Sequence, residues 1–416
     1  MTDVASPSHR CPTPVARPLK PAAMWLVVLA LFAALLAGCA APPPQAVAIS
    51  EELPFDQAID KATEALLAQT QKLPGVLATL DSKLNKRGVV LDPMIDAGSG
   101  QQTAATQVFE RRVVAQIESR HPQFEVLPFK AANLSRSQYL LTGTMTRQPA
   151  AQKRSVFLLN LALTDLKTGN VVAQASARAR DQGVDTTPLP YYQDSPILLK
   201  DKVIDGYVRT TATAPGQPAD RSYFERISTA TLVNDATEAY NAGRYQDALG
   251  QYRAALATPA GEQLRVLNGI YLASWKLGRN AEAEQAFGKV VALGIAHNQL
   301  GVKFLFNPNS TEFWSDSRIS GAYGMWLRQI AREAVNAKVC MDVVGHTSNS
   351  GPEELNDALS LRRASHVRQL LASEAPSLAP RMTPLGKGFR ENIVGTGTDN
   401  AADALDRRVE FKIRPC

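Results

Sequence analysis

The sequence predicts an α+β chain of several domains: a small N-terminal α/β sandwich, a short α-helical repeat pair and a C-terminal βαβαββ domain. Strand-like apolar runs alternate with helical patterns at both ends, whereas the middle shows only helical periodicity with internal self-similarity. The chain has 416 residues, 45% of them hydrophobic, which is enough for several cores at about 100–200 residues each.

Changes in composition divide the chain into segments. Residues 181–228 are rich in Asp, Pro, Thr and Gly and show little periodicity, which is typical of a linker. The predicted segments are a signal peptide (1–38), a tether (39–50), the N-terminal α/β domain (51–180), a linker (181–228), the helical repeats (229–297) and the C-terminal domain (298–416).

The N-terminus has the pattern of a targeting signal. Basic residues Arg10, Arg17 and Lys20 precede an apolar run over 22–38 that ends at Cys39. The run is shorter than the ~20 residues that a membrane-spanning helix needs. It also ends in small residues instead of a positive flank, which favours a cleaved signal over an uncleaved anchor helix.

The sequence "LAGC" (36–39) resembles the bacterial lipobox. The resemblance implies cleavage after Gly38 and attachment of fatty acyl chains such as palmitate to Cys39. Each buried CH₂ of such chains contributes ~0.8 kcal/mol to membrane binding. Residue 40 is Ala, not the Asp that resembles an inner-membrane retention signal, so we expect a lipoprotein on the periplasmic face of the outer membrane.

Charge and cysteine usage narrow the class further. The formal charge of +6 is spread without a Lys/Arg block, which argues against nucleic-acid binding. No histidine lies at ligand spacing from a cysteine or a second histidine, so neither a metal site nor a cofactor is predicted. With Cys11 in the leader and Cys39 lipidated, Cys340 and Cys416 remain, and in an oxidising periplasm a disulfide is favoured over two free thiols.

The N-terminal domain is predicted as β-α-β followed by antiparallel strands. The pattern gives a helix over 56–85 broken at Pro74, a strand over 87–96, a helix over 103–122, strands over 124–129 and 137–146, and a hairpin over 155–179 that turns at Gly169. The strand ending "LDPMID", the helix "VFERRVVAQI" and the hairpin resemble the curli-secretion, flagellar FlgO-type and penicillin-binding-protein-activator-type domains of envelope lipoproteins. No motif in this domain carries chemistry.

Two helical segments repeat each other at a spacing of 35 residues. Residues 239–256 match 274–291, with Gly243, Ala248 and Tyr252 corresponding to Gly278, Ala283 and Phe287. The pattern resembles the tetratricopeptide repeat. Two repeats are fewer than the roughly three that a free-standing array needs, so we expect the pair to be stabilised by packing against neighbouring parts of the chain. A spacer and a protein-docking surface are both open roles for it.

The C-terminal domain alternates strands and helices. The expected elements are a strand over 302–309, a helix over 317–337, a strand over 339–347, a helix over 352–374 and final strands over 381–388 and 407–415. Its motifs resemble the OmpA C-terminal-like, peptidoglycan-binding family over about 115 residues: Gly345-His346-Thr347, Gly351, Asn356, Leu359-Ser360, Arg363-Ala364 and Arg407-Arg408-Val409-Glu410. The resemblance implies a last strand antiparallel to the second, which brings Cys340 to Cys416.

The same resemblance implies a binding site for the diaminopimelate of the peptidoglycan stem peptide. Asn356, Ser360 and Arg363 are spaced to share one helical stripe, beside an apolar stripe expected to pack on the sheet (Leu361, Ala364, Val367 and Leu371). Arg363 would hold the ligand carboxylate by a two-pronged hydrogen bond, and Asn356 would hydrogen-bond to the ligand. Arg407 or Arg408 would add charge, and Thr347 and Ser348 would border the ligand.

Ser348 departs from the family pattern, in which an Asp pairs with the ammonium group of the ligand. Loss of such a charge-assisted contact costs ~1.5–3 kcal/mol, or roughly ten- to hundredfold in affinity. Glu353 or Glu354 is an alternative source of charge, although acids in a first helical turn commonly stabilise the helix dipole. Asp406, which replaces the family's Asn, is expected to pair with one of the two arginines that follow it.

The leading hypothesis is a non-enzymatic, lipid-anchored outer-membrane protein that contacts peptidoglycan non-covalently and scaffolds or regulates periplasmic partners. The alternative is an adaptor with a lapsed peptidoglycan site that acts through protein contacts of the repeats and the N-terminal domain. An enzyme is not predicted, because no Ser-His-Asp elbow, zinc helix or catalytic carboxylate pair is recognisable.

Overall fold

The computed structural model describes residues 45–70, 86–149, 155–298, 300–307, 309–395, 397 and 402–416. The signal peptide, Cys39 and the second half of the helix predicted over 56–85 lie outside these residues. The described elements belong to one compact unit, Pro44–Cys416. Within this part of the chain, no helix is both long and apolar enough to span a membrane.

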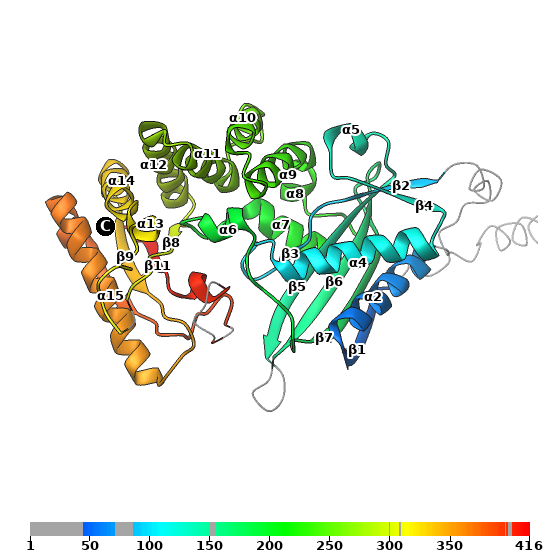
Figure 1. Ribbon diagram of the computed structural model, residues 1–416, viewed down its shortest axis with the longest axis horizontal. Helices are drawn as coiled ribbons and strands as arrows, with labels where there is room; N and C mark the ends of the chain where they lie inside the picture. The colour runs from blue at the N-terminus through cyan, green and yellow to red at the C-terminus, as the bar shows by residue number, and fades with distance from the viewer. Residues whose placement is uncertain are drawn as a thin grey trace, which may run out of the picture. The chain divides into compact units, whose positions relative to one another are not determined.

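The N-terminal part is built on a seven-stranded sheet (Figure 1) in the order β1-β7-β6-β5-β2-β4, with β3 paired to β5. Strands β5, β6 and β7 are antiparallel neighbours, whereas β1, β2, β3 and β4 join the sheet by parallel pairing. The strands are β1 (Val47–Leu53), β2 (Arg87–Leu91), β3 (Ile95–Asp96), β4 (Phe124–Leu127), β5 (Tyr139–Pro149), β6 (Ser155–Asp165) and β7 (Val171–Arg180).

Helices cover both faces of this sheet. Helices α2 (Phe55–Thr70) and α4 (Ala104–Arg120) pack on one face, where Val89 and Leu91 join their core. Val90, which points to the other face, packs in a second core with α7 (Lys202–Thr211). The alternation of β2 residues between two cores explains why this strand is an uninterrupted apolar run.

Two strands differ from the sequence prediction. Strand β1 begins at Val47, inside the predicted tether, because this segment pairs with the exposed edge of β7. The strand expected over 87–96 divides into β2 and β3 around Pro93, which has no N–H to donate. The hydroxyl of Tyr207 lies 3.1 Å from the carbonyls of Pro93 and Gly143 and so satisfies the backbone at the break.

The segment predicted as a linker instead contains three helices and contributes side chains to the cores. It contains α6 (Pro190–Asp194), α7 and α8 (Arg221–Phe224), and it buries Tyr191, Tyr192, Tyr207 and Tyr223. Two of the polar residues that indicated a linker are helix caps. Asp201 accepts hydrogen bonds from the amides of Val203 and Ile204, and Asp220 accepts one from Ser222.

The repeat region consists of α9 (Ile227–Asn241), α10 (Tyr245–Leu256), α11 (Leu264–Lys276) and α12 (Asn280–Ala296), which pack in sequence. Gly243 and Gly278 turn the chain between the helices of each pair with φ of 73° and 71°. Helix α12 packs on α14 (Tyr323–Asn336) of the C-terminal part, where Phe287 stacks on Trp326 and Trp326 Nε1 donates to Tyr271 Oη at 2.8 Å. The repeat helices therefore share a hydrophobic core with the C-terminal sheet, as expected for so short an array.

The C-terminal part has the predicted βαβαββ order on a four-stranded sheet, β10-β9-β11-β8. Its elements are β8 (Leu300–Val302), the short helix α13 (Ser317–Ser320), α14, β9 (Cys340–Gly345), α15 (Glu353–Glu374), β10 (Met382–Gly386) and β11 (Val409–Arg414). Helices α14 and α15 contact each other, and α15 lies against β9 and β10. The α+β class is therefore confirmed.

Strand β8 is shorter than the strand predicted over 302–309. It ends at Val302, after which Phe304 packs on Tyr323 and Trp326 and Phe306 packs on Phe313. These aromatic contacts take the chain out of the sheet and into a loop over residues 303–316. That loop becomes one wall of the candidate site.

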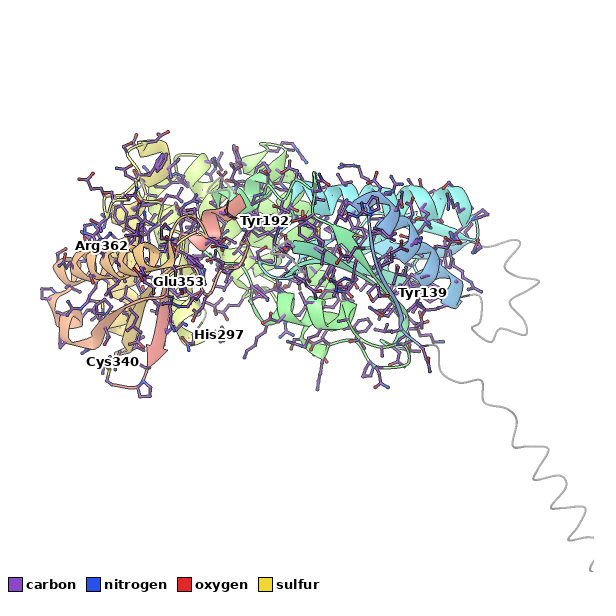
Figure 2. The ribbon with its side chains drawn as sticks, turned by 90° about the horizontal axis from the view of Figure 1, so that it is seen from below. Tyr139, Tyr192, His297, Cys340, Glu353 and Arg362 are labelled. Atoms are coloured by element: carbon purple, nitrogen blue, oxygen red, sulfur yellow. A yellow bond between two sulfur atoms is a disulfide. The ribbon has the colours of Figure 1, made fainter. Side chains whose placement is uncertain are left out.

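The predicted disulfide joins Cys340 to Cys416 (Figure 2), with a Cα–Cα distance of 5.0 Å. Strand β11 runs antiparallel to β9 with Arg414 opposite Cys340, as the family resemblance implies. The crosslink holds the end of β11 to the start of β9.

Candidate functional site

The candidate site lies at one edge of the C-terminal sheet. Val302, Val409, Gly345 and Gly386 are aligned across the four strands. Since β9 and β10 are parallel and β11 is antiparallel to both β8 and β9, the loops that follow β8, β9 and β10 and the loop that precedes β11 all meet at this edge. The motif residues singled out from the sequence lie in these loops, at the adjoining strand ends and in the helix α15 that follows one of the loops.

Glycines let α15 sit directly on this edge. A Cβ atom at Gly345 would lie 2.1 Å from the carbonyl oxygen of Ser360, and one at Gly386 would lie 2.7 Å from the amide of Leu361. Both distances are too short for any side chain. Glycine at these two positions therefore brings the N-terminal half of α15 to the ends of β9 and β10.

The polar and apolar residues of α15 share a single buried face. In order along the helix, this face is formed by Asn356, Leu359, Ser360, Arg363, Ala364, Val367 and Leu371. Polar residues dominate the half beside the loops, and apolar residues the half over the sheet. The expectation of a separate apolar stripe was wrong for Leu361, which is 45% exposed.

Asn356 organises the loop that follows β9. Its Nδ2 donates to the carbonyl of Ser350 at 2.7 Å and to that of Pro352 at 3.1 Å. Ser360 performs a similar role for the loop after β10, because its Oγ accepts from the amide of Gly388 at 3.0 Å. Two predicted motif residues thus fix the walls of the site from the same helix.

Arg363 connects α15 with the loop over residues 303–316. Its Nε donates to the carbonyl of Ser310 at 3.1 Å, and its Nη2 to that of Asn307 at 3.4 Å. Its guanidinium carbon lies 4.7 Å from the centre of the Phe306 ring. Arg363 therefore places a buried guanidinium at the meeting point of these loops.

Thr347 and Ser348 are both buried at the start of the loop after β9. The amide of Thr347 donates to Gly388, and its hydroxyl has no hydrogen-bond partner among the described residues. The hydroxyls of Ser348 and Ser350 lie 3.4 Å apart. The loop is held further by Asn392, whose amide, oriented to donate to Thr347, also accepts from Asn349.

The adjacent arginines at the start of β11 face opposite sides of the sheet. Arg408 is buried and donates to Glu410 Oε1 at 2.7 Å and to the carbonyl of Glu391 at 3.0 Å. Val409 belongs to the helix-covered core, and the alternation of side chains along an extended chain places Arg407 on the same side as Val409. Burial and, to a smaller extent, the positive charge of Arg407 lower the pKa of Lys303 to about 8. The structure therefore places Arg407, and not Arg408, on the side of Arg363.

Asp406 was expected to pair with Arg407 or Arg408, but it binds backbone amides instead. Its carboxylate accepts hydrogen bonds from the amides of Ile393, Val394 and Gly395, at 2.7, 3.0 and 2.8 Å. The carboxylate therefore closes the end of the loop after β10, which explains why an acid is compatible with burial here.

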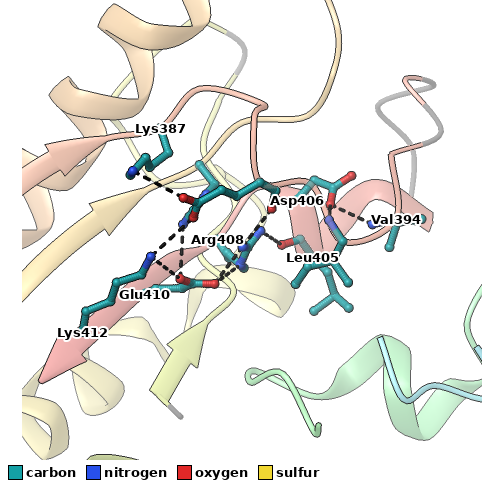
Figure 3. A network of polar contacts seen from close by, with 10 residues as sticks. Lys387, Val394, Leu405, Asp406, Arg408, Glu410 and Lys412 are labelled. Atoms are coloured by element: carbon teal, nitrogen blue, oxygen red, sulfur yellow. Dashed lines mark hydrogen bonds and ion pairs between the residues drawn. The ribbon is translucent and has the colours of Figure 1, made fainter. Parts of the chain in front are cut away.

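A network of charged side chains that sequence reasoning missed lies on the open face of the sheet (Figure 3). Glu410 contacts Arg408 and, at 3.8 Å, Lys412, and its Oε2 lies 3.5 Å from His346 Nε2. Burial opposes ionisation of Glu410, but the contact with His346 and the charge of Arg408 outweigh it and lower the pKa to about 2. Period-two spacing of Arg408, Glu410 and Lys412 is the signal that would have predicted this network.

His346, Glu391 and Glu410 could in principle bind a metal ion, since one ligand atom of each lies within 4.8 Å of the others. However, the ammonium groups of Lys387 and Lys412 each lie 3.4 Å from the carboxylate of Glu391, and Arg408 forms an ion pair with Glu410. A metal ion would have to displace these cations. His346, Glu391 and Glu410 therefore belong to an ion-pair network with these cations.

Comparison with known proteins gives local similarity only. No protein-family model matches the chain. It is 39% identical over 75 residues to "Outer membrane porin F" of Pseudomonas fluorescens, which is 18% of this chain and 22% of that protein. It is 37% identical over 67 residues to "Outer membrane protein Omp38" of Acinetobacter baumannii, or 16% of this chain and 18% of that protein. The chain thus spans about a fifth of the length of the curated relatives it matches.

A solved structure, the peptidoglycan-associated lipoprotein from Burkholderia pseudomallei, shares 24% sequence identity with this chain. The match covers 27% of this chain and 89% of that protein, with a TM-score of 0.23.

Proposed function

We propose that this chain is a non-enzymatic, lipid-anchored outer-membrane protein that contacts peptidoglycan non-covalently at the loop edge of its C-terminal sheet. The observation that carries the proposal is the position of Arg363. It is a buried guanidinium, on the same helix face as Asn356, where the loops after β8 and β9 meet.

The chemistry of this edge suits the carboxylate of a diaminopimelate-type stem peptide. A guanidinium presents two parallel N–H donors to a carboxylate, and Arg407 adds positive charge on the same side. Thr347 and Ser348 offer hydroxyl groups where the ammonium group of the ligand would lie. The lipid on Cys39 would supply the main anchoring, while the local similarity to outer-membrane proteins supports the location.

A second function is favoured by a specific observation. Asn356 and Arg363 already donate to backbone carbonyls of the chain's own loops, and Ser348 brings no charge. A protein with these features would act as an envelope adaptor through protein contacts of the repeat helices and the N-terminal domain, and it would not bind peptidoglycan.

Sedimentation of the full-length protein in detergent with diaminopimelate-containing sacculi tests the proposal. We expect the wild type to pellet weakly and Ser348→Asp to bind roughly ten- to hundredfold more tightly, since it restores one charge-assisted contact. Arg363→Ala should stay in the supernatant. The neighbouring Arg362→Ala, at an exposed position on the outer side of α15 (Figure 2), should behave as wild type.

Melting curves of each variant separate loss of the site from loss of the fold, because Arg363 also holds its loop. If wild type stays soluble and Ser348→Asp pellets, the adaptor function is correct. If neither protein pellets, the edge does not bind peptidoglycan.

A further inference from the structure

A polar cleft of ≈ 340 Å³ lies between the N-terminal sheet and the first repeat helix. It is formed by the loop after β2, the first half of α4 and the second half of α9. Its polar side chains are Gln102, Thr106, Gln107, Glu110, Asn234, Glu238 and Asn241. The volume is in the range of small-molecule sites, about 300–1,000 Å³. No residue of the cleft belongs to the proposed peptidoglycan contact.

The charged side chains that line the cleft are all negative. Among the described residues that line it, the charged side chains are the carboxylates of Glu110 and Glu238. Glu238 is partly neutralised by Lys130, which lies 3.1 Å away outside the lining and also pairs with Asp235. Glu110 has only a long hydrogen bond, 3.3 Å, from the amide of Met94, and it forms no ion pair with any described residue.

The surroundings of Glu110 disfavour its negative charge. Burial raises the pKa of Glu110 and the charge of Glu238 raises it further, which together outweigh the lowering by the amide of Met94 and by the positive charge of Arg111. Behind the cleft lies a smaller chamber of ≈ 20 Å³, enough for about one water, which shares Pro93, Gln102 and Asn234 with the cleft. The charged side chains of this chamber are Asp92 and Arg265; burial raises the pKa of Asp92, and the positive charge of Arg265 opposes that rise. Arg265 does not line the cleft itself, so a cation that entered the cleft would meet Glu110 without an ion-pair partner among the described residues.

The remaining lining is suited to orient such a cation. Asn234 Nδ2 donates to Glu238 Oε1 at 2.9 Å and Asn241 Oδ1 accepts from the amide of Tyr191 at 2.8 Å, so both amides are held in place. Leu189 and Met94 supply apolar surface for a short methylene chain. Fixed amides, carboxylates and a little apolar surface are the groups that recognise an aliphatic amine.

We propose that this cleft binds a small primary amine, with its ammonium group between Glu110 and Glu238 and its methylene groups against Met94 and Leu189. This site is independent of peptidoglycan binding and gives the N-terminal half of the chain a ligand of its own.

Isothermal titration of the full-length protein in detergent with butane-1,4-diamine tests the proposal. The uncharged butane-1,4-diol and the anionic butanedioate have the same chain length and serve as matched probes. We expect binding of the diamine alone, and a loss of about tenfold or more in Glu110→Gln, which removes the charge at constant shape. Glu118→Gln, at an exposed position of the same helix, should leave binding unchanged.

The pH dependence provides a second readout. Because the pKa of Glu110 is raised, the amine should bind more tightly as the pH rises from mildly acidic to mildly alkaline, and Glu110→Gln should lose most of this dependence. The proposal is overturned if the diamine does not bind, if the diol binds as tightly as the diamine, or if Glu110→Gln binds the diamine like wild type in a folded state verified by its melting curve.

Discussion

At the residue scale, individual side chains have roles that their chemistry alone does not reveal. Arg407 and Arg408 are adjacent and identical, yet the first lies on the helix-covered side of the sheet, as Val409 does, and the second pairs with Glu410 on the open face. Asp406, beside them, binds backbone amides instead of either arginine. The sequence could predict that these residues matter but not which partner each has, because that depends on the pleat of β11 and on a loop distant in sequence.

Asp92 supports a prediction about stability. Burial raises the pKa of this carboxyl group from 3.8 to about 7, although the hydroxyl of Tyr223 donates to it at 2.5 Å. The unfolded chain releases this proton at lower pH than the folded protein does. Stability should therefore fall as the pH rises from 3.8 to about 7, by on the order of 4 kcal/mol.

Asp92→Asn should remove most of this loss, because the amide cannot ionise and keeps an oxygen acceptor for Tyr223. Urea denaturation at about pH 5 and about pH 8 checks it: the stability of wild type should fall between the two pH values, and the advantage of the variant over wild type should be larger at the higher pH. Asp247→Asn, at an exposed surface ion pair, is the control and should change little at either pH. An unchanged pH slope in Asp92→Asn would contradict the assignment.

At the scale of elements, most helices and strands followed from apolar periodicity. The hairpin of β6 and β7, helix α4 and the order of the C-terminal elements agree with the predictions. The linker prediction failed because Asp201 and Asp220 cap helices, and capping residues have the same composition as loops. The candidate site was predictable in its residues, from motif spacing, but its loop after β8 was not, because Asn307 and Ser310 contribute only backbone carbonyls.

The close approach of α15 to the end of β9 supports a second stability prediction. Gly345→Ala places a methyl group 2.1 Å from the Ser360 carbonyl, so the helix must move off the sheet edge at a cost of about 1–3 kcal/mol or more. Gly324→Ala, in α14, meets its nearest atom at 3.9 Å and should instead stabilise by up to about 1 kcal/mol. Equal midpoints of chemical denaturation for these two variants would show that α15 does not approach the strand this closely.

At the scale of the whole molecule, one continuous hydrophobic core joins the repeat helices to the C-terminal sheet. Phe287 of α12 and Trp326 of α14 are in contact across the sequence boundary between the two parts. Domains predicted from composition are separate in sequence, but whether they share a core depends on contacts between distant residues, which a single sequence does not reveal.

This shared core predicts that the two parts lose stability together. Phe287→Ala should cost about 3–5 kcal/mol, and hydrogen exchange followed by mass spectrometry should show faster exchange in β9 as well as in α10. Leu355→Ala, at a side chain that is 66% exposed, is a control that should leave both unchanged. Faster exchange confined to the repeat helices would mean that the two parts unfold independently.

Arg407 and Arg408 lie on opposite sides of the sheet, and this limits which insertions and deletions the segment before β11 can accept. Insertions in the loop after β10 would lengthen a surface segment and leave the strands in register. Loss of one residue between Asp406 and Val409 would exchange the two sides, because strand side chains alternate with a period of two. We therefore expect the junction between Asp406 and Val409 to tolerate a change of length less well than the loop that precedes it.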